Sequence, residues 1–343
     1  MNNKVFGIIC ANYNEEAFGT LLEKRTIASL PFGGRYRMID FPLSTLVHAG
    51  ITTVGVFMPY RYRSLIDHIG TGKPWNLDRK IDGLFTLQGE PSSITDRNHR
   101  IHLSDIIANQ RYFQRRAEDS YGVFMTSSFI YNIDLGPILE AHEKSGKDIT
   151  MVYYKNAAGK ECYLNMSIIA RKTILGLIEQ FKYRSRISMD EALKEFISPQ
   201  QVNKYVFDGY VKEIKDISDY VEANDDLLKP EIQAELFNSK RLIYTKTQDE
   251  APALYAKGSS VKNSLVSAGC VVEGQIENCI LFRNVTIKKG AILKNCVVMQ
   301  HTVIEPKAKL TNCIIDKYVR VRTGVSMEGG KERPIIIGKN STI

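Results

Sequence analysis

A junction between a strand and a loop near the amino terminus holds the first residues that could do chemistry. The apolar run from Val5 to Cys10 is short and bounded, which is typical of a fully buried parallel strand. A loop that follows such a strand is a usual place for nucleotide phosphates, and glycines there let backbone amides approach them. Loop 11–18 instead reads ANYNEEAF, which contains no glycine and adds two carboxylates.

The next segment resembles a known family of enzymes. Residues 29–44, SLPFGGRYRMIDFPLS, closely resemble the segment that follows the first strand in bacterial and plant ADP-glucose pyrophosphorylases, the glucose-1-phosphate adenylyltransferases. In that family the first strand is followed by Ala-Gly-Gly-x-Gly-Thr-Arg-Leu, which holds the phosphates. A gapless alignment from Arg25 gives a degenerate phosphate loop, with these residues at its positions: Asn12, Tyr13, Asn14 and Glu15.

Both positions that bear the metal carboxylates in this family are also altered. Ser127-Ser128-Phe129 replaces the family's Gly-Asp-His, and Glu213 replaces the Asp of Trp-x-Asp-Val-Gly-Thr. A serine hydroxyl is a neutral, weak ligand, and a single carboxylate is more often a solvated surface charge. We therefore expect no catalytic residue, metal or cofactor in this chain. Mg²⁺ and ATP would belong to a catalytic partner.

A retained scaffold without its chemical motifs resembles GlgD-type chains, the catalytically impaired partner subunits of this enzyme in Gram-positive bacteria. The resemblance implies a regulatory subunit that joins a catalytic subunit in a hetero-oligomer, a tetramer, and activates the synthesis of ADP-glucose from glucose 1-phosphate and ATP for glycogen. Family effectors bind on basic residues at a seam between domains. The matching positions are Lys24, Arg25, Arg37 and Lys317, which predict a sugar-phosphate or phosphate effector; the alternative is four unrelated surface charges.

Two other functions stay open at this point. The chain could be an active adenylyltransferase in its own right, because the resemblance covers nearly its whole length. It could also be a β-helix acyltransferase, which would need a histidine on the coils, and His301 is the candidate. A lone histidine at a coil corner is more often a turn residue.

One stretch is shorter than in the family. Several dozen residues, including a Glu-Lys-Pro that contacts the sugar phosphate, usually separate two strands that here correspond to 148–154 and 165–169. Only residues 155–164 lie between them. A true deletion and missing residues are both compatible with this sequence.

The elements that would position these residues form an α/β domain over residues 1–228. Helical spacing over 38–49 and a strand over 52–57 make a βαβ unit, and further helices are expected over 104–116, 191–197 and 217–228. The prediction is a nucleotidyltransferase domain with a Rossmann-like, mostly parallel sheet. Residues 229–252 are polar and are predicted to be a linker.

Residues 253–343 carry an internal repeat. VKNS at 261, IENC at 276, LKNC at 293 and LTNC at 310 recur at intervals of fifteen, seventeen and seventeen residues, each followed by paired aliphatic residues. A period just under eighteen fits three hexapeptides, so we predict a left-handed parallel β-helix with Asn and Cys ladders inside the coil. The six cysteines form no CxxC pair and are interpreted as reduced and buried.

Composition excludes several classes of protein. A chain of 343 residues with 43% apolar content can bury the cores of two domains. The net charge of +8 comes from dispersed residues, which argues against a nucleic-acid partner. No apolar run is long enough to span a bilayer and no signal peptide is visible, so we expect a cytoplasmic protein without a membrane partner.

Overall fold

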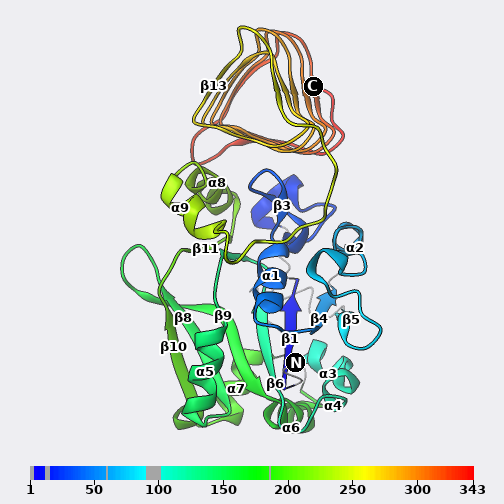
Figure 1. Cartoon of the computed structure of the whole chain (residues 1–343), viewed down its shortest axis with the longest axis vertical. Coiled ribbons are helices and arrows are strands. Elements are labelled where there is room, and N and C mark those ends of the chain that lie inside the picture. Colours follow the sequence, from blue (N-terminus) through cyan, green and yellow to red (C-terminus); the bar gives the residue numbers. More distant parts are fainter. Residues whose placement is uncertain (1–3, 12–15, 59–60, 90–101, 185–186) are drawn as a thin grey trace.

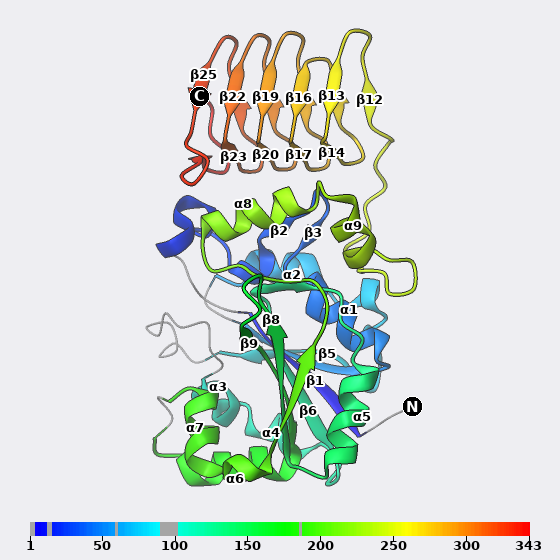
Figure 2. The same ribbon diagram turned by 90° about the vertical axis from the view of Figure 1, so that its left-hand side faces the viewer.

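The computed structural model describes residues 4–11, 16–58, 61–89, 102–184 and 187–343. These residues form an α/β domain and, at the carboxyl-terminal end, a triangular β-helix (Figure 1). Figure 2 shows the stacked coils of the β-helix from the side, with helix α8 (Ile217–Asp226) lying between them and the sheet of the α/β domain. The predicted fold class is confirmed.

The main sheet of the α/β domain has seven strands within the described ranges, in the order β10-β8-β9-β6-β1-β4-β5. Neighbouring strands are parallel except where β9 pairs with β6 and β8. β1 lies inside the sheet and all its residues are buried, as its apolar run predicts. The strands are β1 (Val5–Cys10), β4 (Thr53–Met58), β5 (Gly83–Gln88), β6 (Tyr121–Thr126), β8 (Ile149–Lys155), β9 (Glu161–Ala170) and β10 (Val202–Phe207).

Alternate residues of β1 face two separate cores. Val5 and Ile9 pack with α1, α2 and α5, whereas Phe6 and Ile8 pack with α3, α4, α6 and α7. A strand covered by helices on both faces is expected to bury both sets of side chains. The helices are α1 (Asp40–His48), α2 (Arg63–Ile69), α3 (Leu103–Ala108), α4 (Gln110–Gln114), α5 (Gly136–Ser145), α6 (Arg171–Phe181) and α7 (Met189–Phe196). Of the helices described, none is long and apolar enough to cross a membrane.

A third core joins the α/β domain to the β-helix. Phe32 of the hairpin β2 (Pro31–Phe32)/β3 (Tyr36–Arg37), Leu227 after α8, and Phe282 and Ile314 of the β-helix belong to one buried apolar cluster. The predicted linker 229–252 begins with a further helix, α9 (Pro230–Leu236), and the buried Leu236 joins the same cluster. The β-helix is therefore packed onto the α/β domain through shared apolar contacts.

The β-helix consists of three parallel sheets, each with five strands in the described structure. Aliphatic residues of successive coils pair in register, as in Leu265–Ile280–Val297–Ile314. The first sheet contains β12 (Leu254–Tyr255), β15 (Val271–Val272), β18 (Thr286–Ile287), β21 (Val303–Ile304) and β24 (Arg320–Val321). The second contains β13 (Ser260–Lys262), β16 (Gln275–Glu277), β19 (Ile292–Lys294), β22 (Lys309–Thr311) and β25 (Ser326–Glu328). The third contains β14 (Leu265–Val266), β17 (Ile280–Leu281), β20 (Val297–Val298), β23 (Cys313–Ile315) and β26 (Ile335–Ile337).

The cysteine and asparagine ladders were both predicted inside the coil, but only the cysteines lie there. Cys279, Cys296 and Cys313 are buried, as expected. The asparagines instead lie at a coil corner with left-handed backbone and bond to one another along the outside, from Asn263 Nδ2 to Asn278 Oδ1 at 2.7 Å and onward through Asn295 to Asn312. The prediction of an internal asparagine ladder was wrong because the sharp corner requires a residue that tolerates positive φ, and its side chain then points outward.

The helix expected over 104–116 is interrupted. α3 and α4 meet at Asn109, whose backbone leaves the helical region, and residue 102 rather than Ser104 precedes the first turn. The Asn109 side chain donates to the carbonyls of Asp105 and Gln88, at 2.8 Å each. An asparagine that bonds nearby carbonyls competes with the helical hydrogen bonds, which accounts for the break.

The asparagine corner generates a stability prediction. Asn295→Ala removes two ladder hydrogen bonds and puts alanine, which tolerates left-handed backbone less well than asparagine, at φ 51, so we expect a loss of about 2 kcal/mol in unfolding free energy. Asn295→Gly removes the same bonds but tolerates this backbone, so the expected loss is only about 1 kcal/mol. Urea denaturation measures both variants. Equal losses would show that the left-handed corner contributes nothing.

Candidate functional site

The ends of β1 and β6 lie side by side, where the degenerate active site was predicted. Cys10 pairs with Thr126, and the Ser127 amide donates to the Cys10 carbonyl at 3.2 Å. Ser128 follows directly and is buried. The predicted phosphate-loop residues themselves lie outside the described residues: Asn12, Tyr13, Asn14 and Glu15.

The structure brings the two predicted metal positions to one pair of strands, where Ser128 directly precedes one strand and Glu213 ends the other. β7 (Phe129–Tyr131) pairs antiparallel with β11 (Val211–Glu213), which sets Glu213 opposite Phe129. The amide of Ile214 donates to the Ser128 carbonyl at 2.8 Å. Ser128 and Glu213 are therefore adjacent across the strand pair, although 85 positions separate their numbers.

The chemistry of this pair does not fit a magnesium site. The Ser128 hydroxyl lies 3.4 Å from that of Thr126, and the Glu213 carboxylate is 2.8 Å from the ammonium of Lys215. This contact raises the pKa of Lys215, so the carboxylate already has a cationic partner. Mg²⁺ bound to a triphosphate needs anionic oxygen ligands, and of the two predicted positions only Glu213 supplies one. No group of three His, Cys, Asp or Glu residues in the described chain could hold a metal ion.

The segment that is short relative to the family closes a hairpin. β8 pairs directly with β9, and the turn is held by the Asn156 side chain, which accepts from the amides of Ala158 and Lys160 at 3.1 and 2.9 Å. Beside it lies a cavity of about 580 Å³ lined by Tyr154 and Glu213 among others. The strands thus join without a longer intervening segment.

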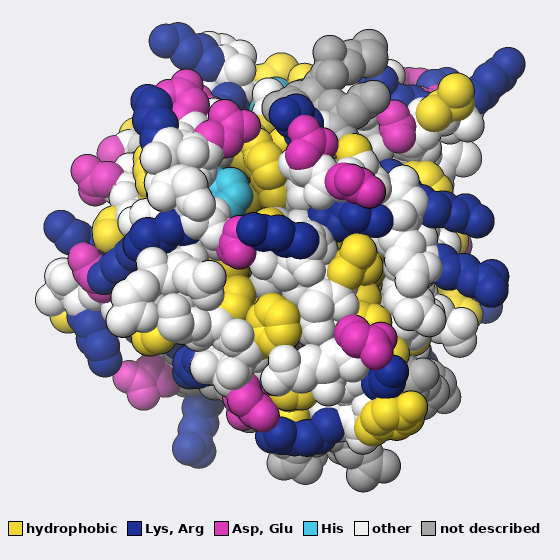
Figure 3. Space-filling model, turned by 90° about the horizontal axis from the view of Figure 1, so that it is seen from below, with side chains coloured by type: hydrophobic (Ala, Val, Ile, Leu, Met, Phe, Trp, Pro, Cys, Tyr) yellow, Lys and Arg dark blue, Asp and Glu magenta, His cyan; other side chains and the backbone are white. Residues whose placement is uncertain are grey.

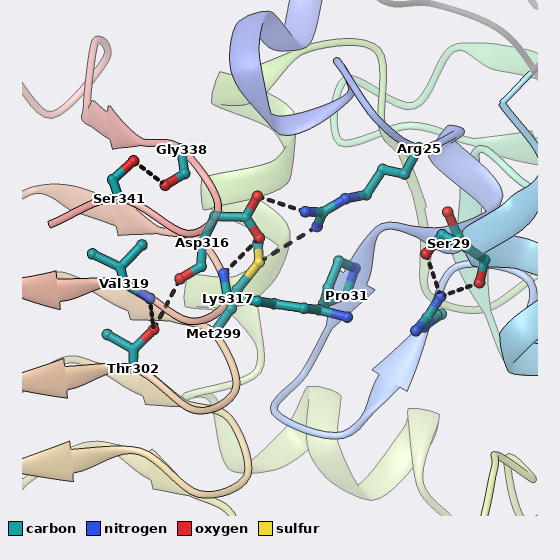
Figure 4. Close-up of polar contacts among 12 residues, drawn as sticks. Arg25, Ser29, Pro31, Met299, Thr302, Asp316, Lys317, Val319, Gly338 and Ser341 are labelled. Atoms are coloured by element: carbon teal, nitrogen blue, oxygen red, sulfur yellow. Dashed lines mark hydrogen bonds and ion pairs between the residues drawn. The ribbon is translucent and has the colours of Figure 1, made fainter.

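Arg25 crosses the seam between the two domains. Its guanidinium donates to the Asp316 carboxylate at 2.5 Å and contacts the sulfur of Met299 at 3.8 Å, both in the β-helix (Figure 4). The side chains of Arg25 and Asp316 are only 6% and 1% exposed, so this is a buried ion pair. The sequence revealed Arg25 as a basic residue, but it gave no sign that Asp316 would bind it.

Lys317 and Arg37 lie beside this pair. The Lys317 side chain extends from the β-helix toward Pro31 (Figure 4), and burial, followed by the charges of Arg37 and Arg25, lowers its pKa to about 6. Burial likewise lowers the pKa of Arg37 to about 10, although the charge of Asp40 opposes this shift. The Arg37 guanidinium donates to the carbonyl and hydroxyl of Ser64 at 2.6 and 2.9 Å.

Three of the four predicted effector residues therefore come together. Arg25, Arg37 and Lys317 arrive from separate segments and influence one another's charge, whereas Lys24 is exposed to solvent. Clustered guanidinium and ammonium groups are suited to a phosphate or sulfate, whose charge would offset their repulsion.

His301, the residue required by the acyltransferase alternative, lies at an exposed coil corner. Its φ is 58, and its ring stacks on Tyr318 with centroids 4.9 Å apart. His301 is therefore placed as a turn residue of the β-helix.

The surface opposite the β-helix carries mixed charge. Lys and Arg side chains alternate there with Asp and Glu over the visible face (Figure 3). This face offers no continuous basic patch of the kind that nucleic-acid binding requires.

Comparison with known proteins agrees with this architecture. The nucleotidyl transferase family matches residues 22–163, and the family described as GlmU-like, C-terminal hexapeptide, matches residues 252–333. The chain is 38% identical to the glycogen biosynthesis protein GlgD of Bacillus subtilis strain 168, over 98% of this chain and 96% of that protein. It is 37% identical to GlgD of Geobacillus stearothermophilus, over 99% and 98%. A glucose-1-phosphate adenylyltransferase of Clostridium botulinum strain Eklund 17B is 30% identical, over 85% and 84%. The chain therefore belongs to the GlgD family of glycogen biosynthesis proteins.

Proposed function

We propose that this chain is a catalytically impaired regulatory subunit of ADP-glucose pyrophosphorylase. It assembles with a catalytic subunit and raises the rate at which that partner makes ADP-glucose from glucose 1-phosphate and ATP. Mg²⁺ and ATP act in the partner. A subunit of this kind needs a surface for assembly and a means of sensing effectors, but it needs no metal ligands of its own.

The observation that carries the proposal is the pair Ser128 and Glu213. A neutral hydroxyl occupies one predicted metal position, and the carboxylate at the other is held by Lys215. Loss of transition-state charge stabilisation by a metal costs several kcal/mol, which is enough to abolish useful turnover.

The alternative is an active glucose-1-phosphate adenylyltransferase. The similarity to adenylyltransferases of this name, such as that of Clostridium botulinum at 30% identity, favours it. The degenerate metal pair argues against it.

The first coil of the β-helix supports the assembly part of the proposal. β12, β13 and β14 are terminal strands of their three sheets, so each has one edge without a strand of this chain in the described structure. Leu254 and Tyr255 on this coil are 61% and 51% exposed, and Val261 is 37% exposed. Unpaired edges next to exposed apolar side chains favour contact with another subunit.

Arg25, Arg37 and Lys317, the seam cluster, support the regulatory part of the proposal. Arg25 of the α/β domain and Lys317 of the β-helix lie close enough for their charges to interact, so an anion bound there would contact both domains. A ligand shifts a conformational equilibrium only by its difference in affinity for the two states. A bridging anion is sensitive to how the domains are packed, which makes it suited to regulation.

An assembly and activity assay tests the function. The isolated chain is expected to make little or no ADP-glucose, because Ser128 and the paired Glu213 cannot hold the metal. This chain is then mixed in equal amounts with a catalytic glucose-1-phosphate adenylyltransferase subunit. The mixture is expected to elute as one species in size-exclusion chromatography with light scattering. Its rate of ADP-glucose synthesis is expected to exceed that of the catalytic subunit alone. A tenfold gain needs only about 1.4 kcal/mol of differential contact energy.

Matched tyrosine variants control this experiment. Tyr255→Lys on the first coil should weaken co-elution and activation, whereas Tyr183→Lys, at a residue 92% exposed beyond α6, should not. Separate elution with an unchanged catalytic rate, or turnover by this chain alone at the level of the catalytic subunit, would refute the regulatory role.

Sulfate binding tests the seam as an anion site. Sulfate keeps its charge near neutrality, so a change in affinity with pH reports on the protein. If binding requires protonated Lys317, whose pKa is about 6, calorimetric affinity should fall from pH 6 to pH 8, approaching about tenfold per pH unit. Lys317→Met should bind weakly at both values, and exposed Lys307→Met should behave as wild type. A wild-type affinity that does not vary with pH would contradict a role for Lys317.

The same residue predicts how stability depends on pH. The pKa of Lys317 is lowered on folding from 10.5 to about 6, so between these values the unfolded chain binds the extra proton. Stability of the wild type should therefore fall as pH falls through this window. Replacing Lys317 with Met removes the effect, so the variant's advantage in Tm should be larger at pH 6 than at pH 9. A constant difference would show that Lys317 is not desolvated.

A further inference from the structure

A cavity of about 330 Å³ opens on the α/β domain, away from the strand ends that carry Ser128. Three segments form it: the end of α1 at His48, the turn Lys73–Trp75 with Arg79 beyond it, and Tyr244 from the segment that leads to the β-helix. Neither the degenerate active site nor the seam cluster contributes a residue.

The turn that forms the cavity wall is firmly built. Gly72 and Asn76 flank it in the left-handed region, with φ of 84 and 56. The amides of Trp75 and Leu77 both donate to the Gly72 carbonyl, at 3.0 and 3.1 Å, and the Arg79 Nε donates to the Asn76 carbonyl at 2.9 Å. The turn therefore fixes the direction in which Arg79 leaves the backbone.

The cavity is lined by positive charge. Lys73 and Arg79 both line it, and neither forms an ion pair with a carboxylate within the described ranges. The described lining residues include no Asp or Glu. Two unneutralised cations in one hollow favour an anionic ligand, and guanidinium with ammonium suits a phosphate in particular.

Trp75 supplies a second, independent feature. Its side chain is 1% exposed, and its indole N–H has no hydrogen-bond partner among the described residues. A buried donor without an acceptor is costly, and each such group calls for an explanation. Because this N–H is closed off from the cavity, an occupant would change the surroundings of the indole without accepting a hydrogen bond from it.

Tyr244 closes one side and connects the cavity to the β-helix. Its ring stacks on His48 with centroids 5.1 Å apart, and its amide donates to the Ser44 hydroxyl at 2.8 Å. His48 in turn bonds the Leu242 carbonyl at 2.7 Å. The connecting segment is thus held against α1, and an occupant of the cavity would touch it.

We propose that this cavity is a second ligand site, which binds a small phosphorylated molecule. The phosphate lies between Lys73 and Arg79, and the remainder of the molecule packs against the exposed ring of Tyr244. The site goes beyond the proposed regulatory function, because it is separate from the seam and needs no partner subunit.

The sequence offers a selective probe for this site, because Trp75 is the single tryptophan of the chain. Tryptophan fluorescence of the full-length protein is followed during titration with inorganic phosphate and with ribose 5-phosphate, which separates the phosphate contribution from that of an attached sugar. A saturable change with either compound is expected. No saturable change with both, up to roughly 10 mM, would overturn the proposal.

Charge variants locate the response. The double variant Lys73→Gln/Arg79→Gln should raise the half-saturating concentration at least about tenfold, because both charge-assisted contacts are lost. Lys80→Gln, an exposed neighbour outside the lining, should respond as wild type. Trp75 also touches His68, with ring centroids 5.9 Å apart, so seam binding could reach it indirectly. Lys317→Met should therefore retain the response. A response kept in the double variant or lost in Lys317→Met would place the ligand elsewhere and refute the site.

Discussion

The buried ion pair between Arg25 and Asp316 sets how the two domains meet. Its nitrogen–oxygen distance is 2.5 Å, and it lies beside the apolar cluster that joins the domains. Breaking such a pair by removing one partner typically costs about 3–5 kcal/mol, because the other charge stays buried. Each residue therefore holds the opposite domain in place, and the seam geometry follows from this contact.

This arrangement also makes protonation of Lys317 unfavourable. The residue after Asp316 must enter the same seam, where burial and the charges of Arg37 and Arg25 oppose its protonation. Asp316 already binds Arg25 and accepts the Lys317 amide at 2.7 Å, so it neutralises the cluster only in part. An anion that binds the folded form alone would relieve the repulsion and stabilise the packed domains. The repulsion in the free seam would therefore also be the source of the anion affinity proposed for it.

Local patterns in the sequence predicted the elements, and long-range contacts decided the site. The apolar run of β1 is recognisable from its length alone, and it predicted the buried strand. The seventeen-residue repeat is recognisable from its spacing, and it predicted the β-helix. Arg25 meets Asp316 across 291 positions, and no local pattern encodes that pairing. The break at Asn109 involves the Gln88 carbonyl, which lies on another element, as well as the local Asp105 carbonyl. The cavity at Trp75 needs Tyr244 from the connecting segment, so it too was invisible in the sequence.

Catalytic and structural positions differ in how easily they can change. The β7–β11 pairing is made by the backbone, and the Ser128 carbonyl accepts from Ile214 whatever side chain residue 128 carries. A metal carboxylate at this position can therefore become a serine without disturbing the fold. Arg25 and Asp316 are coupled through side chains, so a change in one leaves the other charged and buried. The chemistry can thus be lost one residue at a time while the seam persists. This asymmetry gives a physical route to the kind of chain proposed here, in which the seam between the domains persists although the metal carboxylates do not.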